Sequence, residues 1–176
     1  VHGKYRVATQ NTTFSMPETA IGLFCDVGSM WWMPRVLPTQ GVANYVALTG
    51  AKLKPEDLMY TGLATHYVSS DRLEELEIAL VQATKVLEET ETMKDVCAPI
   101  LMSFHEAPPV NPRESFLAKH RSAIDSSFTE DSVEAIVENL KEMDNDFSQK
   151  TLTSLAKLSP TSLKVTLEGL RRGAND

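Results

Sequence analysis

The hydrophobic pattern of the chain changes after residue 68, and this change limits the fold more than any other feature. Before it, short apolar runs at residues 5–8, 12–16 and 64–68 lie between polar turns and predict three short strands. After it, apolar residues recur at spacings of three and four, as in amphipathic helices. Because an average sheet has about five or six strands, three short ones make a poor sheet alone. The pattern predicts an α/β core with a helical appendage, or part of a larger α/β fold.

The part after this change contains the signals of a run of helices. The first has a stripe of apolar residues formed by Leu73, Leu76, Leu80, Ala83 and Leu87. Further helices are predicted over residues 93–104, 114–124, 133–140 and 148–158. The proline-rich stretch 107–112 is the clearest break in the chain, and we interpret it as a linker between helical layers.

Glycine and short polar residues indicate where several helices begin and end. In the first part, residues 41–48 predict a helix that ends near Gly50. In the second part, Thr129 or Asp131 is expected to cap the helix that follows them. Gly173 is expected to end the last helix of the chain.

Composition is that of a globular protein and excludes several classes of function. The chain has 176 residues, of which 42% are hydrophobic and 23% charged, and its net charge is −7. This acidic balance argues against binding to nucleic acid or to an anionic membrane through bulk charge. No apolar run approaches the ~18 residues that a membrane span needs. Cys25 and Cys97 indicate reduced intracellular thiols, although a single bridge stays open, and no histidine pair has metal-ligand spacing.

Two carboxylates, Glu18 and Asp26, lie inside an otherwise apolar stretch that glycines interrupt, residues 16–28. Carboxylate pairs in such surroundings suit general acid–base chemistry. A structural interpretation is also open, in which Glu18 caps a turn and Asp26 is the N-cap of a helix that begins near Val27. The two roles are compatible, because an N-cap carboxylate can also face a site. The bulky residues 31–33 that follow either pack in the core or form an exposed apolar wall.

Several motifs together resemble one protein family. The most specific is the run Met16-Pro17-Glu18-Thr19-Ala20-Ile21-Gly22-Leu23, which is followed by Asp26-Val27-Gly28. Further matching stretches lie at residues 1–9, 34–35, 48–50, 62–68, 132–140 and 158–167. The chain resembles the 3-hydroxyisobutyryl-CoA hydrolase family of the enoyl-CoA hydratase/isomerase (crotonase) superfamily over nearly its whole length, more weakly over residues 80–115.

The resemblance implies hydrolysis of a small acyl-CoA thioester, chiefly 3-hydroxyisobutyryl-CoA from valine breakdown. It implies that Glu18 acts as nucleophile or general base toward the thioester carbonyl, while Asp26 orients water or the substrate hydroxyl and helps to transfer protons. Tyr45 stands where enoyl-CoA hydratases carry a second glutamate, which favours hydrolysis over hydration. Coenzyme A would be part of the substrate, with no separate cofactor and no metal. The location would be the mitochondrial matrix in a eukaryote and otherwise the cytoplasm.

The resemblance also implies the fold, a partial crotonase-like (ClpP/crotonase) spiral of ββα units followed by a predominantly helical region. Residues 1–68 would be the C-terminal part of the core and carry the catalytic carboxylates, and residues 69–176 would be the helical region. In the family, oxyanion-hole N–H groups come from glycine-rich segments that would precede Val1. We therefore expect these 176 residues to be an internal to C-terminal fragment that is inactive alone. The expected partner is a small acyl-CoA, and a homo-oligomer stays open.

The chain departs from the family pattern at two places. Cys25 replaces the family's proline before the aspartate, and the bulky residues 29–32 replace small ones after the motif, which changes the expected size of the acyl pocket. The Trp31-Trp32 pair motivates one alternative, a non-catalytic hydrolase-like structural subunit, for example of a mitochondrial ribosome. The other alternative is an enoyl-CoA hydratase or isomerase, which would not release free coenzyme A.

Overall fold

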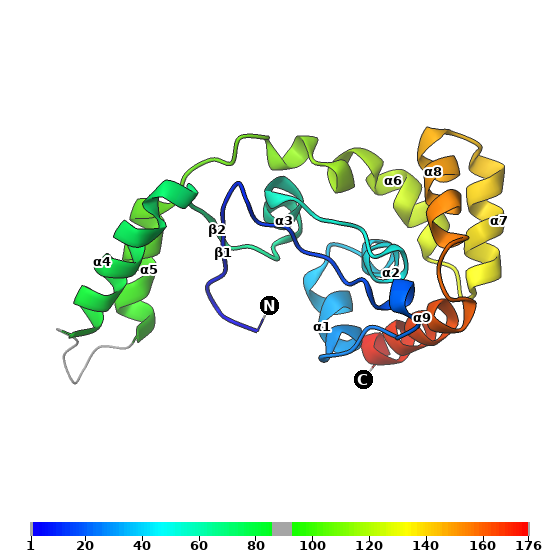
Figure 1. Ribbon diagram of the computed structural model, residues 1–176, viewed down its shortest axis with the longest axis horizontal. Coiled ribbons are helices and arrows are strands. Elements are labelled where there is room, and N and C mark those ends of the chain that lie inside the picture. The colour runs from blue at the N-terminus through cyan, green and yellow to red at the C-terminus, as the bar shows by residue number, and fades with distance from the viewer. Residues whose placement is uncertain (1, 86–92, 176) are drawn as a thin grey trace.

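The structure is a computed structural model that describes residues 2–85 and 93–175, and it consists of a helical body from which a helical hairpin projects (Figure 1). Its elements, in chain order, are β1 (Val7–Ala8), the 3-10 helix η1 (Glu18–Ile21), α1 (Ser29–Val36), α2 (Gln40–Thr49), α3 (Pro55–Thr61), β2 (His66–Tyr67), η2 (Ser70–Arg72), α4 (Leu73–Lys85), α5 (Met93–Phe104), η3 (Pro112–Glu114), α6 (Phe116–Phe128), α7 (Val133–Met143), α8 (Asp146–Leu155) and α9 (Pro160–Asn175). The predicted helical run is confirmed, while Leu87 lies outside the described residues.

Helix α2 is the centre of the body. Residues 41–48 are all buried, because the helix packs against α1, α6, α8, α9 and η1. Gly41 allows α6 to approach closely, since a Cβ atom there would lie 2.9 Å from the Cα of Asp125. The main hydrophobic cluster draws residues from both sides of residue 68, so the two predicted parts of the chain share one core.

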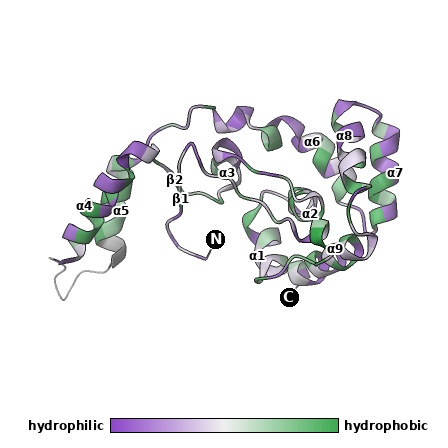
Figure 2. Cartoon of the chain, viewed as in Figure 1, coloured by the Kyte–Doolittle hydropathy of each residue, from purple (hydrophilic) through white to green (hydrophobic). Residues whose placement is uncertain are grey.

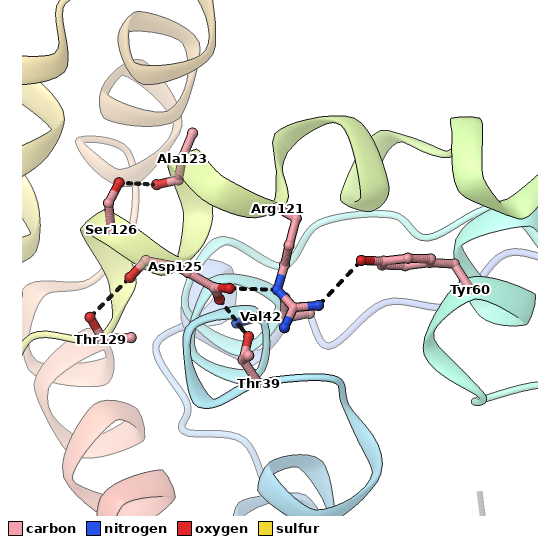
Figure 3. A network of polar contacts seen from close by, with 8 residues as sticks. All are labelled: Thr39, Val42, Tyr60, Arg121, Ala123, Asp125, Ser126 and Thr129. Carbon is pink, nitrogen blue, oxygen red and sulfur yellow. Dashed lines mark hydrogen bonds and ion pairs between the residues drawn. The ribbon is translucent and has the colours of Figure 1, made fainter.

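A polar network holds the N-terminal end of α2 against α6 and α3 (Figure 3). Thr39 caps α2 by accepting a hydrogen bond from the Val42 N–H, and its hydroxyl donates to Asp125 Oδ1 at 2.5 Å. Arg121 donates from Nε to Asp125 Oδ2 at 2.5 Å and from Nη1 to the Tyr60 hydroxyl at 3.2 Å. These half-buried groups therefore satisfy one another where three helices meet.

The sheet of the described part is small, and one predicted strand is wrong. The strands β1 and β2 pair in parallel, with Val7 opposite His66, which confirms the strands predicted near both positions. The run over residues 12–16 makes only an isolated antiparallel bridge, between Phe14 and Leu53. The reason is that a turn precedes this run and Pro17 follows it, so its β-propensity has little length over which to pair.

Two predicted helix ends also differ from those observed. The N-cap of α7 is Ser132, whose hydroxyl accepts a hydrogen bond from Ala135 N at 3.2 Å, rather than Thr129 or Asp131. The cap is Ser132 because it is the residue with extended backbone directly before the helix. Gly173 does not end the last helix, since α9 continues through it to Asn175.

Gly173 instead allows α9 to pack closely on α1. A Cβ atom on Gly173 would overlap the carbonyl oxygen of Met30, and one on Gly169 would overlap the Met30 thioether. Arg35 of α1 reinforces the contact by donating from Nη1 to the Gly173 carbonyl at 2.5 Å. The two glycines therefore reflect helix packing and not helix termination.

Replacing Gly173 with alanine is expected to lower the free energy of unfolding by about 2 kcal/mol, because a rigid backbone atom blocks the new methyl group. Gly169→Ala is the matched control, because the Met30 side chain can rotate away from the new methyl group. This variant should lose clearly less free energy of unfolding. Urea unfolding followed by circular dichroism measures both. Equal losses would contradict the role assigned to the Met30 carbonyl.

The hairpin of α4 and α5 is amphipathic and is anchored at its base. In Figure 2 α4 carries green and purple bands and α5 is largely green, and their apolar residues form a second cluster around Val68, Leu76 and Leu101. The Tyr67 N–H donates to His105 Nδ1 at 3.0 Å, so this nitrogen must be unprotonated. The His66 ring lies 5.6 Å from that of His105. Burial and the neighbouring His105 lower the pKa of His66 below its ordinary value of 6.5.

We expect stability to fall as the pH decreases below about 6.5. In this range the unfolded chain binds a proton at His66 more readily than the folded chain does, because the pKa of His66 is lower in the folded state. The neutral His66 of the folded state therefore costs no stability above the unfolded pKa, and the protein loses stability as the pH falls from the unfolded pKa to the folded pKa. Urea midpoints between pH 5 and 8 measure the slope. His66→Gln should reduce it, whereas His2→Gln, at an exposed position, should leave it unchanged.

Candidate active site

The segment that carries the two candidate carboxylates is a tight turn followed by a loop. Glu18 follows Pro17 and begins η1, and the carbonyl of Glu18 accepts a hydrogen bond from Leu23 N at 2.9 Å. Gly22 closes the turn in the left-handed conformation, with φ 78°. Glu18 is half-buried.

Thr19 fixes the backbone next to Glu18 on two distant elements. It is fully buried, and its hydroxyl donates to the Leu48 carbonyl of α2 at 3.0 Å. Its carbonyl accepts a hydrogen bond from Ser159 N, in the connection between α8 and α9, at 3.2 Å. The position of Glu18 therefore depends on helices far along the chain.

Asp26 is exposed and does not cap α1, so that prediction is wrong. Val27 and Gly28 separate it from the helix, with φ of 47° and 73°, and Gly28 is the N-cap. The backbone of Asp26 still helps to form the turn that leads into α1, because its carbonyl accepts a hydrogen bond from Ser29 N at 2.8 Å. A left-handed conformation is unusual for a β-branched residue such as Val27, and strain of this kind clusters at functional sites.

Cys25 is the buried residue directly before Asp26. Its Sγ lies 3.7 Å from Glu18 Oε2 and 3.6 Å from the Ala47 carbonyl oxygen. Burial raises the pKa of the thiol to about 12, helped by the negative charge of Glu18 and, more weakly, by that of Asp26. The thiol therefore contacts Glu18, whereas Asp26 is the exposed residue that directly follows Cys25 in the chain.

The segment that carries the two carboxylates and the start of α1 also hold exposed apolar side chains: Ile21, Leu23, Phe24, Val27 and Trp31. The expected apolar wall is therefore confirmed at Trp31, whose exposed fraction is 55% and whose indole lies 4.3 Å from the Arg35 guanidinium. Trp32 and Met33 are buried and belong to the core. Such a surface favours an apolar ligand or partner beside the carboxylates.

Tyr45 lies on α2 beside a separate cavity. A cavity of about 420 Å³ is lined by Tyr45, Phe116, His120, Phe147 and Lys150 among others, and does not include Glu18 or Asp26. Burial, together with the charge of Asp57, raises the pKa of Tyr45 to about 12, so its hydroxyl stays protonated. It cannot supply the carboxylate that a second glutamate would.

Two other kinds of site are absent from residues 2–85 and 93–175. Among these, no three histidine, cysteine, aspartate or glutamate side chains gather in a way that could hold a metal ion. Within the same ranges, no helix has the length and apolar character needed to cross a membrane.

Comparison with known proteins decides the family. A sequence profile described as enoyl-CoA hydratase/isomerase matches residues 1–176. The chain belongs to the enoyl-CoA hydratase/isomerase family. It is 42% identical to the mitochondrial 3-hydroxyisobutyryl-CoA hydrolase of Gallus gallus and 44% identical to that of Xenopus tropicalis, over 99% of the chain in both cases. It covers 43% and 44% of those two proteins, so it spans less than half of their length.

Solved structures of the family confirm the partial crotonase-like fold. A carnitinyl-CoA dehydratase from Mycobacterium thermoresistibile matches with a TM-score of 0.82 at 33% identity, over 99% of this chain and 46% of that one. An enoyl-CoA hydratase from Rhodobacter sphaeroides matches with a TM-score of 0.76 at 28% identity, over 97% of this chain and 44% of that one.

Sequence reasoning missed one residue that shapes the site, Gly50. It has φ 62°, and a Cβ atom there would lie 3.3 Å from the Met16 carbonyl oxygen and 3.4 Å from the Pro17 Cα. The end of α2 therefore touches the backbone that leads into Glu18. The glycine was visible as a helix end, but its contact with a segment more than thirty residues earlier was not.

Gly50→Ala is expected to lower the free energy of unfolding by about 2 kcal/mol, from the left-handed backbone and the contact with Met16 together. Gly62→Ala is the control, because Gly62 also has a positive φ of 76° but its Cβ would meet nothing within 4 Å. Gly62→Ala should therefore lower the free energy of unfolding by only about 1 kcal/mol. Chemical denaturation measures both, and equal losses would argue against a contact between α2 and the segment before Glu18.

Proposed function

We propose that the whole protein hydrolyses a small acyl-CoA thioester such as 3-hydroxyisobutyryl-CoA. The observation that carries this proposal is the half-buried Glu18, whose Oε2 lies 3.7 Å from the buried Cys25 thiol, in a segment that also contains the exposed Asp26 and exposed apolar side chains. The names of the similar mitochondrial hydrolases support the substrate class. The buried Tyr45 supports hydrolysis over hydration, because it offers no carboxylate.

Glu18 is the residue proposed to act on the thioester carbonyl. As a general base it would take a proton from water while the water oxygen bonds to the carbonyl carbon; as a nucleophile its own oxygen would form that bond first. In the base route the carbon–sulfur bond then breaks, and the coenzyme A sulfur takes the proton that Glu18 holds. In the nucleophile route the same bond breaks to leave an acyl group on Glu18 as a mixed anhydride, and water then cleaves this anhydride, frees the acid and Glu18, and supplies the proton for the coenzyme A sulfur. Asp26, which is exposed at the edge of the site, would orient the water or the substrate hydroxyl and pass on protons.

Coenzyme A would enter as part of the substrate, and we propose no separate cofactor. The similar proteins from Gallus gallus and Xenopus tropicalis are mitochondrial by name, and we propose the same compartment if this protein is eukaryotic, or the cytoplasm otherwise. A homo-oligomer stays a prediction.

A second candidate function rests on the exposed apolar surface. Trp31 and Val27, with exposed fractions of 55% and 70%, could contact a protein partner, as expected for a hydrolase-like structural subunit. The third alternative, a hydratase or isomerase, would change the acyl group and leave the thioester intact. Release of free coenzyme A separates hydrolysis from both.

Glu18→Gln is expected to lower kcat for 3-hydroxyisobutyryl-CoA hydrolysis by about 10²-fold or more, since the amide cannot accept the proton or attack. Coenzyme A release detected with a thiol reagent measures the rate in the whole protein. Glu138→Gln is the control, because that exposed glutamate lies on α7, where it pairs with Lys141 at 2.8 Å, and its substitution should change the rate little.

Full activity in Glu18→Gln would overturn the role of this residue. Conversion of the acyl group without release of coenzyme A would favour the hydratase or isomerase alternative. No reaction in the unsubstituted whole protein, combined with copurification of a ribonucleoprotein, would favour the structural subunit.

A further inference from the structure

The Cys25 side chain has one proton to donate and two acceptors within reach. Glu18 Oε2 lies 3.7 Å from its Sγ, on the side of the site, and the Ala47 carbonyl oxygen lies 3.6 Å away, on α2. The residue is almost fully buried, so water cannot replace either acceptor. A thiol has a single S–H bond and can therefore serve one of these oxygens at a time.

The backbone of Cys25 is held independently of its side chain. Its N–H donates to the Thr166 hydroxyl of α9 at 3.4 Å. Cys25 thus contacts α9 through its backbone N–H, and its thiol contacts both the Ala47 carbonyl of α2 and the Glu18 carboxylate. The raised pKa agrees with this placement, because burial and the Glu18 charge both keep the thiol protonated and able to donate.

We propose that Cys25 is a positioning residue, whose S–H donates to Glu18 Oε2 and holds this carboxylate in the orientation that the reaction needs. The inference rests on the proposed function, in which Glu18 is the residue that acts on the thioester. Cys25 acts on the reaction only through the Glu18 carboxylate, and it forms no covalent bond.

The second acceptor explains how one donor can serve both states of Glu18. While the carboxylate is charged, it is the stronger acceptor and takes the S–H hydrogen bond. When Glu18 takes up a proton or an acyl group, its oxygen becomes a weaker acceptor and the S–H turns toward the Ala47 carbonyl. The buried donor then keeps a partner throughout the cycle, which avoids the cost of leaving it unsatisfied.

Substitution of Cys25 in the whole protein tests this role through the rate. Cys25→Ala is expected to lower kcat about fivefold, the effect of one hydrogen bond, with KM little changed. Cys25→Ser restores a donor of similar size and should recover the rate to within about twofold. Cys97→Ala is the control, since Cys97 lies on α5 in the second hydrophobic cluster, and it should leave kcat unchanged. Equal kcat values in the Cys25→Ala and Cys25→Ser variants would overturn the proposal, because the loss of rate would then come from altered packing and not from a lost hydrogen bond.

Infrared spectroscopy of the S–H stretching band gives a readout that needs no turnover. The band that disappears in Cys25→Ala belongs to this thiol, and Glu18→Gln should move it to higher wavenumber because an amide oxygen accepts more weakly than a carboxylate. A band that stays in place would overturn the hydrogen bond. If the band moves but the protein releases no coenzyme A, the proposed function fails while the contact between Cys25 and Glu18 stands.

Discussion

Burial of α2 on all sides is the constraint on which the rest of the structure depends. A helix with eight consecutive buried residues can be stable only if neighbours cover its whole circumference, and here α1, α6, α8, α9 and η1 do so. The contact with α6 is close because Gly41 faces it without a side chain, and the Ala47 carbonyl oxygen lies 3.6 Å from the Cys25 thiol. The one buried amide on the helix, Asn44, donates to the Phe128 carbonyl at 2.7 Å, so no polar group opposes the packing there.

The candidate site is a consequence of this packing. The loop between η1 and α1 has little regular structure of its own, and it is held by hydrogen bonds from Thr19 to α2 and from Cys25 to α9. The half-buried Glu18 and the exposed Asp26 therefore take their positions from helices that follow them by up to about 140 residues in the sequence, as the Cys25 to Thr166 separation of 141 shows. A site built this way is rigid only when the helical body is intact, which couples stability to the chemistry proposed for it.

Amphipathic stripes made the helices predictable, because the period of a helix can be recognised within a dozen residues. The stripe from Leu73 to Ala83 and the apolar face of Val133, Ile136 and Leu140 lie on the helices predicted for them. Two predictions failed where the outcome depends on distant residues. Gly173 does not end a helix but allows contact with Met30 of α1. The run over residues 12–16 does not form a strand, because it makes a single bridge to Leu53. The carboxylates could be selected from their motif, but Cys25 could not be recognised as a hydrogen-bond donor to Glu18.

The sequence by itself determined the helical pattern, the acidic charge and the resemblance to the crotonase superfamily, because each of these depends on residue types at short spacing. Only the tertiary structure decided which oxygens meet the Cys25 thiol, why Gly50 and Gly173 are glycines, and that Asp26 lies outside α1. The physical reason is that hydrogen bonds and steric exclusion act over a few ångströms in space. Met16 and Gly50 meet at such a distance although 34 positions separate them in the sequence. The residues that meet between α1 and α9 are separated by far more.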